Sequence, residues 1–296
     1  MSETPPTRIA VIRNPISGLS SRHRLVPAFL RALGTGGAEV TPLDTEGPGH
    51  AIDLAREAGE RGCDVVVAVG GDGTMNEVLN GLSRGGPALA TFPAGTASVF
   101  ARATGMPFSP EEAARTVLAG RRRRIDVGRV NGRRFLLMVS VGWDAHVVAE
   151  VARSRRGHLG VHRYVLPVLH ALRDYRWPRL SVLFDGAGVP QPARLAFACN
   201  FRDYGGIFRI APDAQPDDGL LDFATFRRGG ARDSVRWAVG ALLGTLPRLR
   251  ETEFVRGRTL VVTSDEPVPF QVDGDPGGVT PVTIETEPDA LEVIVP

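Results

Sequence analysis

Lysine is absent from the 296-residue sequence, in which all 35 basic side chains are arginine. A Walker A loop and a protein kinase each place a lysine on the nucleotide phosphates, and pyridoxal or Schiff-base chemistry needs a lysine amine. The sequence therefore excludes these classes of enzyme. Its net charge of +2 is too small to indicate a nucleic-acid partner.

Cysteine is scarce and long apolar runs are missing. Cys63 and Cys199 lie far apart without a Cys-x-x-Cys pattern, which indicates neither a disulfide framework nor a zinc site. No stretch reaches the ~18 to 20 apolar residues of a membrane span. Met1–Thr7 lacks the basic and apolar regions of a signal peptide. We therefore expect a cytoplasmic protein with room for two domains.

The chain is organised around a strand, a glycine-rich loop and a helix. The β-branched run Val65–Val69 predicts a buried strand, and Val78, Leu79 and Leu82 share one face of the helix that follows. Glycines in the loop can take positive φ and let the backbone approach a ligand, while the helix N-terminus after Thr74 supplies unpaired N–H groups. Such a loop suits a phosphate.

One acid, Asp72, stands among these glycines. A carboxylate repels phosphate unless a metal ion lies between them or the acid does chemistry. An ordinary tight turn explains the glycines but not Asp72. The segment Gly70–Thr74 (Gly-Gly-Asp-Gly-Thr) resembles the motif shared by diacylglycerol kinase catalytic domains, sphingosine kinases, NAD kinases and, more loosely, phosphofructokinases.

Earlier segments favour the lipid kinases among these relatives. A strand is expected at Ile9–Arg13, and the segment Asn14–Gly18 (Asn-Pro-Ile-Ser-Gly) is similar to one that lies beside the nucleotide in diacylglycerol kinases and that NAD kinases usually lack. Further on, Ala38–Leu43 predicts a second strand and Ala51–Gly62 a helix. Between them, Thr45 matches a family position that touches the nucleotide, or is a helix cap.

A second glycine turn follows the strand expected at Ala88–Phe92. It reads Pro93–Ser98, precedes a helix at Val99–Thr104, and resembles the family's Pro-x-Gly-Thr-x-Asn segment with Ser98 in place of Asn. In open parallel sheets ligands bind outside the carboxyl ends of the strands. We therefore expect the loops at Asn14, Gly70 and Gly95 to face one crevice.

The pattern of strands changes near residue 130. The repeated strand and helix units before it, ending with a helix at Pro110–Gly120 and a strand at Ile125–Val130, predict a Rossmann-like parallel α/β domain over residues 1–130. Asn131–Gly132 predicts a hairpin, and short alternating strands follow. The resemblance implies a β-sandwich-like C-terminal domain over residues 131–296, whose last residues are candidates for packing back on the first domain.

Two late segments carry the remaining site residues. The first, residues 205–222, resembles the family's structural Mg²⁺ segment, in which Asp218 supplies a carboxylate and Gln215 and Leu220 supply backbone carbonyls; a plain hairpin is the alternative. The second, Gln271–Asp275, matches the family's Asp-Gly-Glu segment, whose last acid is the proton acceptor. Asp275 stands at the Glu position, and either Asp273 or Asp275 is the base.

Three further features allow two readings each. Asp144, in a segment similar to the family's Gly-Phe-Asp-Ala, is a helix cap or a site residue. Arg121–Arg124 is a solvated strand start or attracts anionic lipid. Val161–Leu172 is a kinked core helix or faces a membrane.

Taken together, the motifs are similar to those of a bacterial-type diacylglycerol kinase-like lipid kinase. The resemblance implies γ-phosphoryl transfer from ATP, with Mg²⁺, to a lipid alcohol, with Asp72 holding the catalytic ion and Asp275 as base. It implies nucleotide contacts at Asn14, Thr45, Gly70, Gly71, Asp72, Gly73, Thr74, Asn76, Glu77, Gly95 and Thr96. An NAD kinase and a non-catalytic nucleotide sensor are the alternatives. Transient contact with an anionic membrane and a homodimer are further hypotheses.

Overall fold

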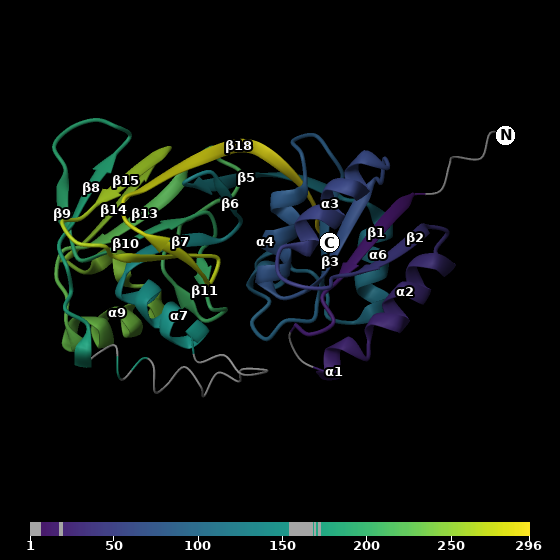
Figure 1. Ribbon diagram of the computed structural model, residues 1–296, viewed down its shortest axis with the longest axis horizontal. Coiled ribbons are helices and arrows are strands. Elements are labelled where there is room, and N and C mark those ends of the chain that lie inside the picture. Colours follow the sequence, from purple (N-terminus) through teal and green to yellow (C-terminus); the bar gives the residue numbers. More distant parts are fainter. Residues whose placement is uncertain (1–6, 18–19, 154–167, 169, 171–172) are drawn as a thin grey trace. The chain divides into compact units, whose positions relative to one another are not determined.

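The computed structural model describes residues 7–17, 20–153, 168, 170 and 173–296 (Figure 1). Most of the helix predicted at Val161–Leu172 lies outside the described residues. The chain divides into two compact units, one of Met1–Ile125 with Asp289–Pro296 and one of Asp126–Pro288. Within the described residues, no helix is long and apolar enough to cross a membrane.

The first unit is built on a parallel sheet in the order β2-β1-β3-β4. The β-branched strand β3 is buried along its whole length, whereas β2 at the edge of the sheet is exposed or half-buried. The last residues of the chain add to it, because Val293 pairs in parallel with Leu89. The strands are β1 (Arg8–Arg13), β2 (Glu39–Asp44), β3 (Val65–Gly70), β4 (Ala88–Pro93), and the C-terminal part of β18 (Val282–Ile294).

Helices cover both faces of this sheet. On one face α3 packs against α4, and on the other α2 packs against α6. The helices are α1 (Ser20–His23), α2 (Val26–Thr35), α3 (His50–Glu60), α4 (Asp72–Gly81), α5 (Val99–Thr104) and α6 (Pro110–Ala119). Every strand and helix predicted for this part of the sequence is present, with ends that differ by a few residues.

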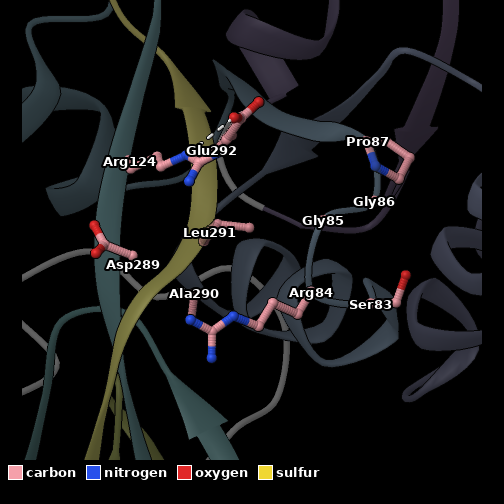
Figure 2. Close-up of a pocket in the computed structure, with 10 residues that line it drawn as sticks. All are labelled: Ser83, Arg84, Gly85, Gly86, Pro87, Arg124, Asp289, Ala290, Leu291 and Glu292. Atoms are coloured by element: carbon pink, nitrogen blue, oxygen red, sulfur yellow. Dashed lines mark hydrogen bonds and ion pairs between the residues drawn. The ribbon is translucent and has the colours of Figure 1, made fainter.

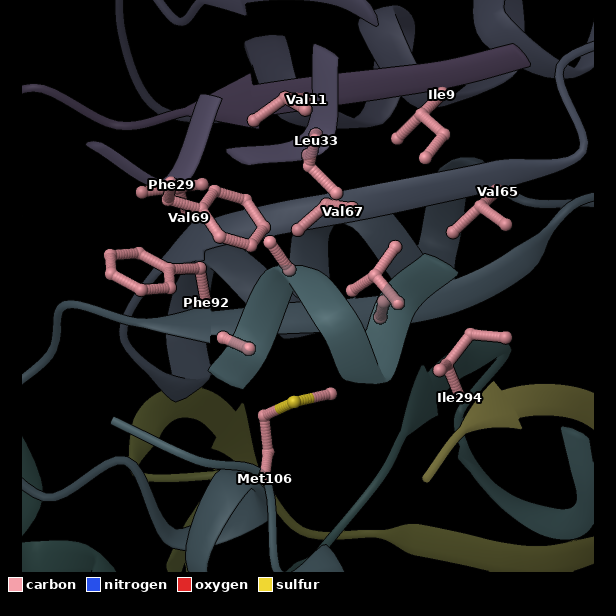
Figure 3. Close-up of a cluster of buried hydrophobic side chains, with 14 of the residues drawn as sticks. Ile9, Val11, Phe29, Leu33, Val65, Val67, Val69, Phe92, Met106 and Ile294 are labelled. Atoms are coloured by element: carbon pink, nitrogen blue, oxygen red, sulfur yellow. The ribbon is translucent and has the colours of Figure 1, made fainter. Parts of the chain in front are cut away.

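A core of alternate strand side chains lies under α2 and α6 (Figure 3). Phe29 of α2 stacks on Phe92 of β4 with ring centroids 4.5 Å apart, and both side chains are almost fully buried. Because parallel strands are covered on both sides, their sequences read as continuous apolar runs rather than alternating ones.

The second unit contains two layers of β structure. One is the antiparallel sheet β14-β13-β10-β7-β16-β17, and the other holds β9, β8 and β15 beside β18, with β5 and β6 attached. The elements are β5 (Arg122–Val130), β6 (Arg133–Phe135), β7 (Met138–Gly142), α7 (Trp143–Arg153), β8 (Leu180–Phe184), β9 (Gln191–Ala193), β10 (Leu195–Cys199), β11 (Asp203–Tyr204), β12 (Phe208–Arg209), β13 (Leu221–Phe226), α9 (Ala231–Leu243), η2 (Leu246–Arg248), β14 (Thr252–Gly257), β15 (Thr259–Thr263), β16 (Pro269–Val272) and β17 (Asp275–Val279).

Side chains from both layers share one core, which includes Phe223 and Val139 from the first sheet and Leu260 and Ile284 from the second. This is a β-sandwich, as expected. Helix α7 contacts β7 and β16, and Trp237 of α9 packs on Phe226 of β13, so both helices lie on the outer face of the β14-to-β17 sheet (Figure 1).

Two local expectations need correction. Helix α4 begins at Asp72, not after Thr74, so the acid lies in the first helical turn. The loop glycines 70, 71, 73 and 95 are not among the positive-φ residues, and Gly71 is extended at φ −96°. By contrast, the predicted hairpin at Asn131–Gly132 is confirmed: both residues have positive φ and Val130 pairs with Arg133.

The stack of Phe29 on Phe92 yields a stability prediction. Phe29→Ala should lower the free energy of unfolding by about 3–5 kcal/mol, since it removes buried area and leaves a cavity. Leu30 lies one residue along the same helix and is only partly buried, so Leu30→Ala should lower the free energy of unfolding by less. Urea denaturation of both variants measures the difference; equal losses would contradict the assignment of Phe29 to the core centre.

Candidate active site

Loops that follow the first strands meet at the carboxyl edge of the parallel sheet. The backbone N–H of Asn14 donates to Val69 O at 3.1 Å, and that of Thr45 donates to Arg13 O at 2.8 Å. The N–H of Gly95 donates to Gly70 O at 2.9 Å. These bonds join the ends of neighbouring strands, so the predicted loops do lie along one edge, where open parallel sheets bind ligands.

The two glycine turns pack backbone against backbone. A Cβ added to Gly95 would lie 2.3 Å from the Cα of Gly71, and one added to Gly70 would lie 2.4 Å from the Thr74 hydroxyl. Real Cβ atoms do not approach so closely, so only glycine fits at either position. The glycines are needed for this close approach of the loops rather than for positive φ.

Asp72 fastens the two turns together. Its Oδ2 accepts the N–H of Val99 and its Oδ1 accepts the N–H of Phe100, each at 3.0 Å. These groups are the first N–H donors of α5, which have no partner within their own helix. Asp72 therefore caps a helix that begins 27 residues away in the sequence, and its charge favours the positive end of the helix dipole.

The other predicted nucleotide contacts are placed differently. Thr96 is exposed on the second turn, and Gly73 and Glu77 are half-buried on α4. Thr74 and Asn76 are buried, and Asn76 accepts hydrogen bonds from the Asn80 side chain within α4. Among the loop residues, Thr96 is exposed and Gly71 is half-buried, whereas Gly70, Gly95 and Asn76 are buried.

Cations that sequence reasoning did not single out lie beside the second turn. Arg22 of α1 donates through Nη1 to the Gly95 carbonyl at 2.6 Å. Two guanidinium groups lie over the Phe108 ring, that of Arg22 at 4.9 Å and that of Arg102 at 5.2 Å from the ring centroid. Burial, and repulsion by Arg102, lower the pKa of Arg22. Because the chain has no lysine, a cationic side chain that binds phosphate must be an arginine. This is the sequence signal that could have pointed to Arg22 and Arg102.

A separate pocket lies at the opposite edge of the same sheet, before β4 (Figure 2). Arg124 bonds to Glu292 at one side of it. It is lined by Ser83, Arg84, Gly85, Gly86, Pro87, Arg124, Asp289, Ala290, Leu291 and Glu292. These residues adjoin the amino end of β4, so the pocket is distinct from the loops at the carboxyl edge.

The predicted Mg²⁺ segment in the second unit carries an excess of negative charge. Asp218 Oδ1 accepts the N–H of Leu220 at 3.0 Å, and Oδ2 contacts the Arg256 guanidinium. Burial and the neighbouring Asp213 raise the pKa of Asp222 to about 6. Arg256 lies beside both Asp218 and Asp222. Carboxylates in a loop that also carries the Gln215 and Leu220 carbonyls fit the oxygen ligands of a hard ion.

No group of three or more His, Cys, Asp or Glu side chains in the described part of the chain could hold a metal ion. An ion in this loop would therefore depend on backbone carbonyls as well as Asp218. Arg256 would have to share that carboxylate with it.

The two candidate bases differ in their surroundings. Asp273 Oδ2 accepts the N–H of Leu136, and its Oδ1 accepts those of Leu137 and Met138, at 2.8 to 3.0 Å. Asp273 thus holds the β16–β17 turn, with its own backbone at φ 51°. Asp275 begins β17 and is half-buried. The Asp273 carboxylate is thus engaged by three backbone donors.

Asp144 is the second residue of α7 and not its cap. Its Oδ2 accepts the Ser140 hydroxyl at 2.6 Å and its Oδ1 accepts the Tyr204 hydroxyl at 2.8 Å. Burial raises the pKa of Asp144, although both hydroxyl hydrogen bonds act to lower it. A carboxyl that holds its proton more tightly than usual is typical of functional sites as well as of buried networks.

Comparison with known proteins agrees with this architecture. The family described as "Diacylglycerol kinase catalytic domain" matches residues 8–130, and the "YegS C-terminal NAD kinase beta sandwich-like domain" matches residues 137–295. A diacylglycerol kinase of Bacillus subtilis is 30% identical over 93% of this chain and 91% of its own length. One from Staphylococcus saprophyticus is 26% identical over 98% of this chain and 95% of its own.

Solved structures share the fold. A diacylglycerol kinase structure from Bacillus anthracis superposes with a TM-score of 0.77 at 22% identity, covering 99% of this chain and 98% of its own. A further structure from that organism gives a TM-score of 0.81 at 24% identity over 99% of both chains. Fold and sequence together place the protein among phosphotransferases with an alcohol acceptor. The chain belongs to the diacylglycerol kinase family.

The bonds from Asp72 to α5 predict a loss of stability when the acid is changed. Asp72→Asn keeps the shape of the side chain but turns an amide donor toward a backbone N–H. This change should lower the free energy of unfolding by about 1–3 kcal/mol. Asp53→Asn removes an exposed ion pair with Arg56, and its free energy of unfolding should stay within about 0.5 kcal/mol of that of wild type. Denaturation in chelator measures both. An unchanged midpoint for Asp72→Asn would show that its carboxylate is not structural.

The raised pKa of Asp144 predicts a pH dependence. The folded chain holds this proton to higher pH than the unfolded chain, in which an aspartate has a pKa of about 3.9. The contribution of the protonated Asp144 to the free energy of unfolding is therefore complete below pH ~4, and it is lost as pH rises through the folded-state pKa. Relative to Asp144→Asn, wild type should lose stability in urea denaturation as the pH rises from about 4 through the interval in which the folded chain still holds the proton. A relative gain over that interval would contradict the assignment.

Proposed function

We propose that the protein is an ATP-dependent lipid kinase that transfers the γ-phosphoryl group to a hydroxyl of diacylglycerol or a related lipid alcohol. The observation that carries the proposal is the pair of glycine turns locked together by Asp72 at the carboxyl edge of the sheet. Membership of the family supports it, since relatives from Bacillus and Staphylococcus are named diacylglycerol kinases.

In this proposal the first turn and the start of α4 bind phosphates. Gly71 is the N-cap of α4, so the first N–H groups of that helix have no partner within the helix itself, as at the helix ends that bind anions. The Arg22 and Arg102 guanidinium groups near the second turn supply positive charge in place of the missing lysine. Phosphoryl transfer depends on such positioning and charge neutralisation more than on covalent chemistry.

The acceptor hydroxyl must lose its proton as it attacks phosphorus. We assign Asp275 as the base, because three backbone N–H groups already occupy the Asp273 carboxylate. Asp275 is one methylene shorter than glutamate, so its backbone must lie closer to the acceptor or a water must intervene. Asp273 positions the turn that carries it.

Mg²⁺ has two proposed places. Bound with ATP, the ion would supply positive charge against the transferred phosphoryl group. Asp72 is the proposed protein ligand of that ion, held in one orientation by its bonds to α5. The Asp218 loop, with the Gln215 and Leu220 carbonyls, is the proposed structural site.

The assignment of the base gives the sharpest kinetic prediction. Asp275→Asn should lose ~10²-fold to 10⁴-fold in turnover and keep its affinity for ATP, whereas Asp275→Glu should stay active. Asp273→Asn should melt at a lower temperature yet keep turnover per folded molecule. Should Asp273→Asn abolish turnover while Asp275→Asn stays near wild type, Asp273 is the base.

The function itself is tested with γ-labelled ATP and a set of acceptors. Wild type with Mg²⁺ should label detergent-dispersed diacylglycerol or another lipid alcohol, identified by mass spectrometry. Label in NAD instead of lipid would make the protein an NAD kinase. ATP binding without label in any acceptor would make it a nucleotide sensor.

A further inference from the structure

Helix α9 carries apolar side chains on the face that points away from its own unit. Val235, Val239, Leu242 and Leu243 are 58%, 49%, 52% and 69% exposed. Their spacing of four, three and one residues places them in one stripe along the helix. Large apolar side chains gathered on one exposed face mark an interaction surface, whereas single ones do not.

The opposite face fixes the orientation of the helix. Ser234, Trp237, Gly240 and Ala241 are buried. The Trp237 ring packs on Phe226 of β13 with centroids 4.7 Å apart and contacts Trp177 at 5.8 Å. Turning the stripe inward would expose this aromatic cluster. The exposure of the stripe is therefore a stable property of the second unit.

Exposed arginines lie at both ends of the stripe. Arg228 and Arg232 lie near the start of α9, and Arg248 and Arg250 follow its end. Within the described part of the chain, no carboxylate lies within ion-pair distance of any of these four side chains. Their neighbours Arg227 and Arg236, by contrast, pair with Glu253 and Glu251. The stripe therefore lies between uncompensated positive charges.

This charge pattern distinguishes between two kinds of partner. A two-fold contact with a second copy would bring the same patch against itself, and the arginines of one copy would face those of the other. An anionic bilayer complements both features, since apolar side chains enter the acyl boundary while arginines lie at the phosphate level. Each arginine near such a surface adds attraction.

We propose that the α9 face, defined by Val235, Val239, Leu242, Leu243 and the four arginines, is the surface through which the protein adsorbs to anionic membranes. The inference rests on the proposed function, because a lipid kinase has to reach an acceptor that resides in a bilayer. It adds to that function a named docking surface, which lies outside both glycine turns and the Asp275 turn.

Flotation with vesicles tests the proposal on the full chain. Wild type should bind vesicles of phosphatidylglycerol and phosphatidylcholine, bind phosphatidylcholine alone poorly, and be released by salt. Val239→Glu should lower binding to the anionic vesicles at least about tenfold, since it replaces an exposed apolar side chain that enters the acyl boundary with a carboxylate that the anionic lipids repel. Val189→Glu makes the same change at a valine that is 77% exposed in the β8–β9 loop and should bind like wild type.

The charges are tested in parallel. Arg232→Gln should weaken binding to anionic vesicles and leave the weak binding to neutral vesicles unchanged, while Arg258→Gln should alter neither. Equal melting temperatures for all variants exclude unfolding as the cause. Wild-type affinity of Val239→Glu for anionic vesicles would overturn the proposal. A second result would also overturn the proposal: a wild-type dimer in sedimentation velocity that becomes a monomer in Val239→Glu. That result would assign the α9 face to contact with a second copy of the chain.

The outcome is separable from that of the proposed function. If wild type phosphorylates detergent-dispersed diacylglycerol but Val239→Glu still binds vesicles, the kinase proposal stands and the α9 assignment is wrong. If no lipid is phosphorylated but vesicle binding depends on Val239, the α9 face is a membrane surface and the kinase proposal is wrong.

Discussion

The close packing of two glycine turns, tied by Asp72, is the constraint on which the candidate site depends. Gly95 approaches Gly71 so closely that no side chain fits at Gly95, and the Asp72 carboxylate holds the start of α5 against the first turn. Both turns are thereby fixed at the carboxyl edge of the sheet. A phosphate site built from backbone N–H groups needs such rigidity, because its donors cannot adjust through side-chain rotation.

Much of the fold could be predicted from local patterns. The apolar run at Val65–Val69 and the amphipathic stretch at Pro110–Gly120 each match an element of the structure within a residue or two. The Asn131–Gly132 hairpin was predictable because positive φ at both positions favours those residues. The sandwich rested on resemblance, since short alternating strands do not by themselves say which sheets face each other.

The rest depends on contacts between residues far apart in the sequence. Nothing near Asp72 shows that its carboxylate caps α5, and the motif alone favours a metal or catalytic role. Asn76, a predicted nucleotide contact, lies two residues beyond the motif, and the register of α4 turns it into the unit. Similarly, the sequence leaves Asp273 and Asp275 both as candidate bases, and it does not show the three N–H groups that reach the Asp273 carboxylate from another segment. Helix periodicity could have revealed the α9 stripe, but not that its other face is buried.

The central claim is that the paired glycine turns form the ATP site, and ATP calorimetry on Gly95→Ala tests it most directly. The added methyl group would lie 2.3 Å from the Gly71 Cα and must push the turns apart. Gly34→Ala is the matched control, because nothing lies within 4 Å of a Cβ at that position. We expect Gly95→Ala, with the circular dichroism of the folded protein, to bind ATP at least about tenfold more weakly, and Gly34→Ala to bind it normally. Wild-type ATP affinity in folded Gly95→Ala would contradict the account.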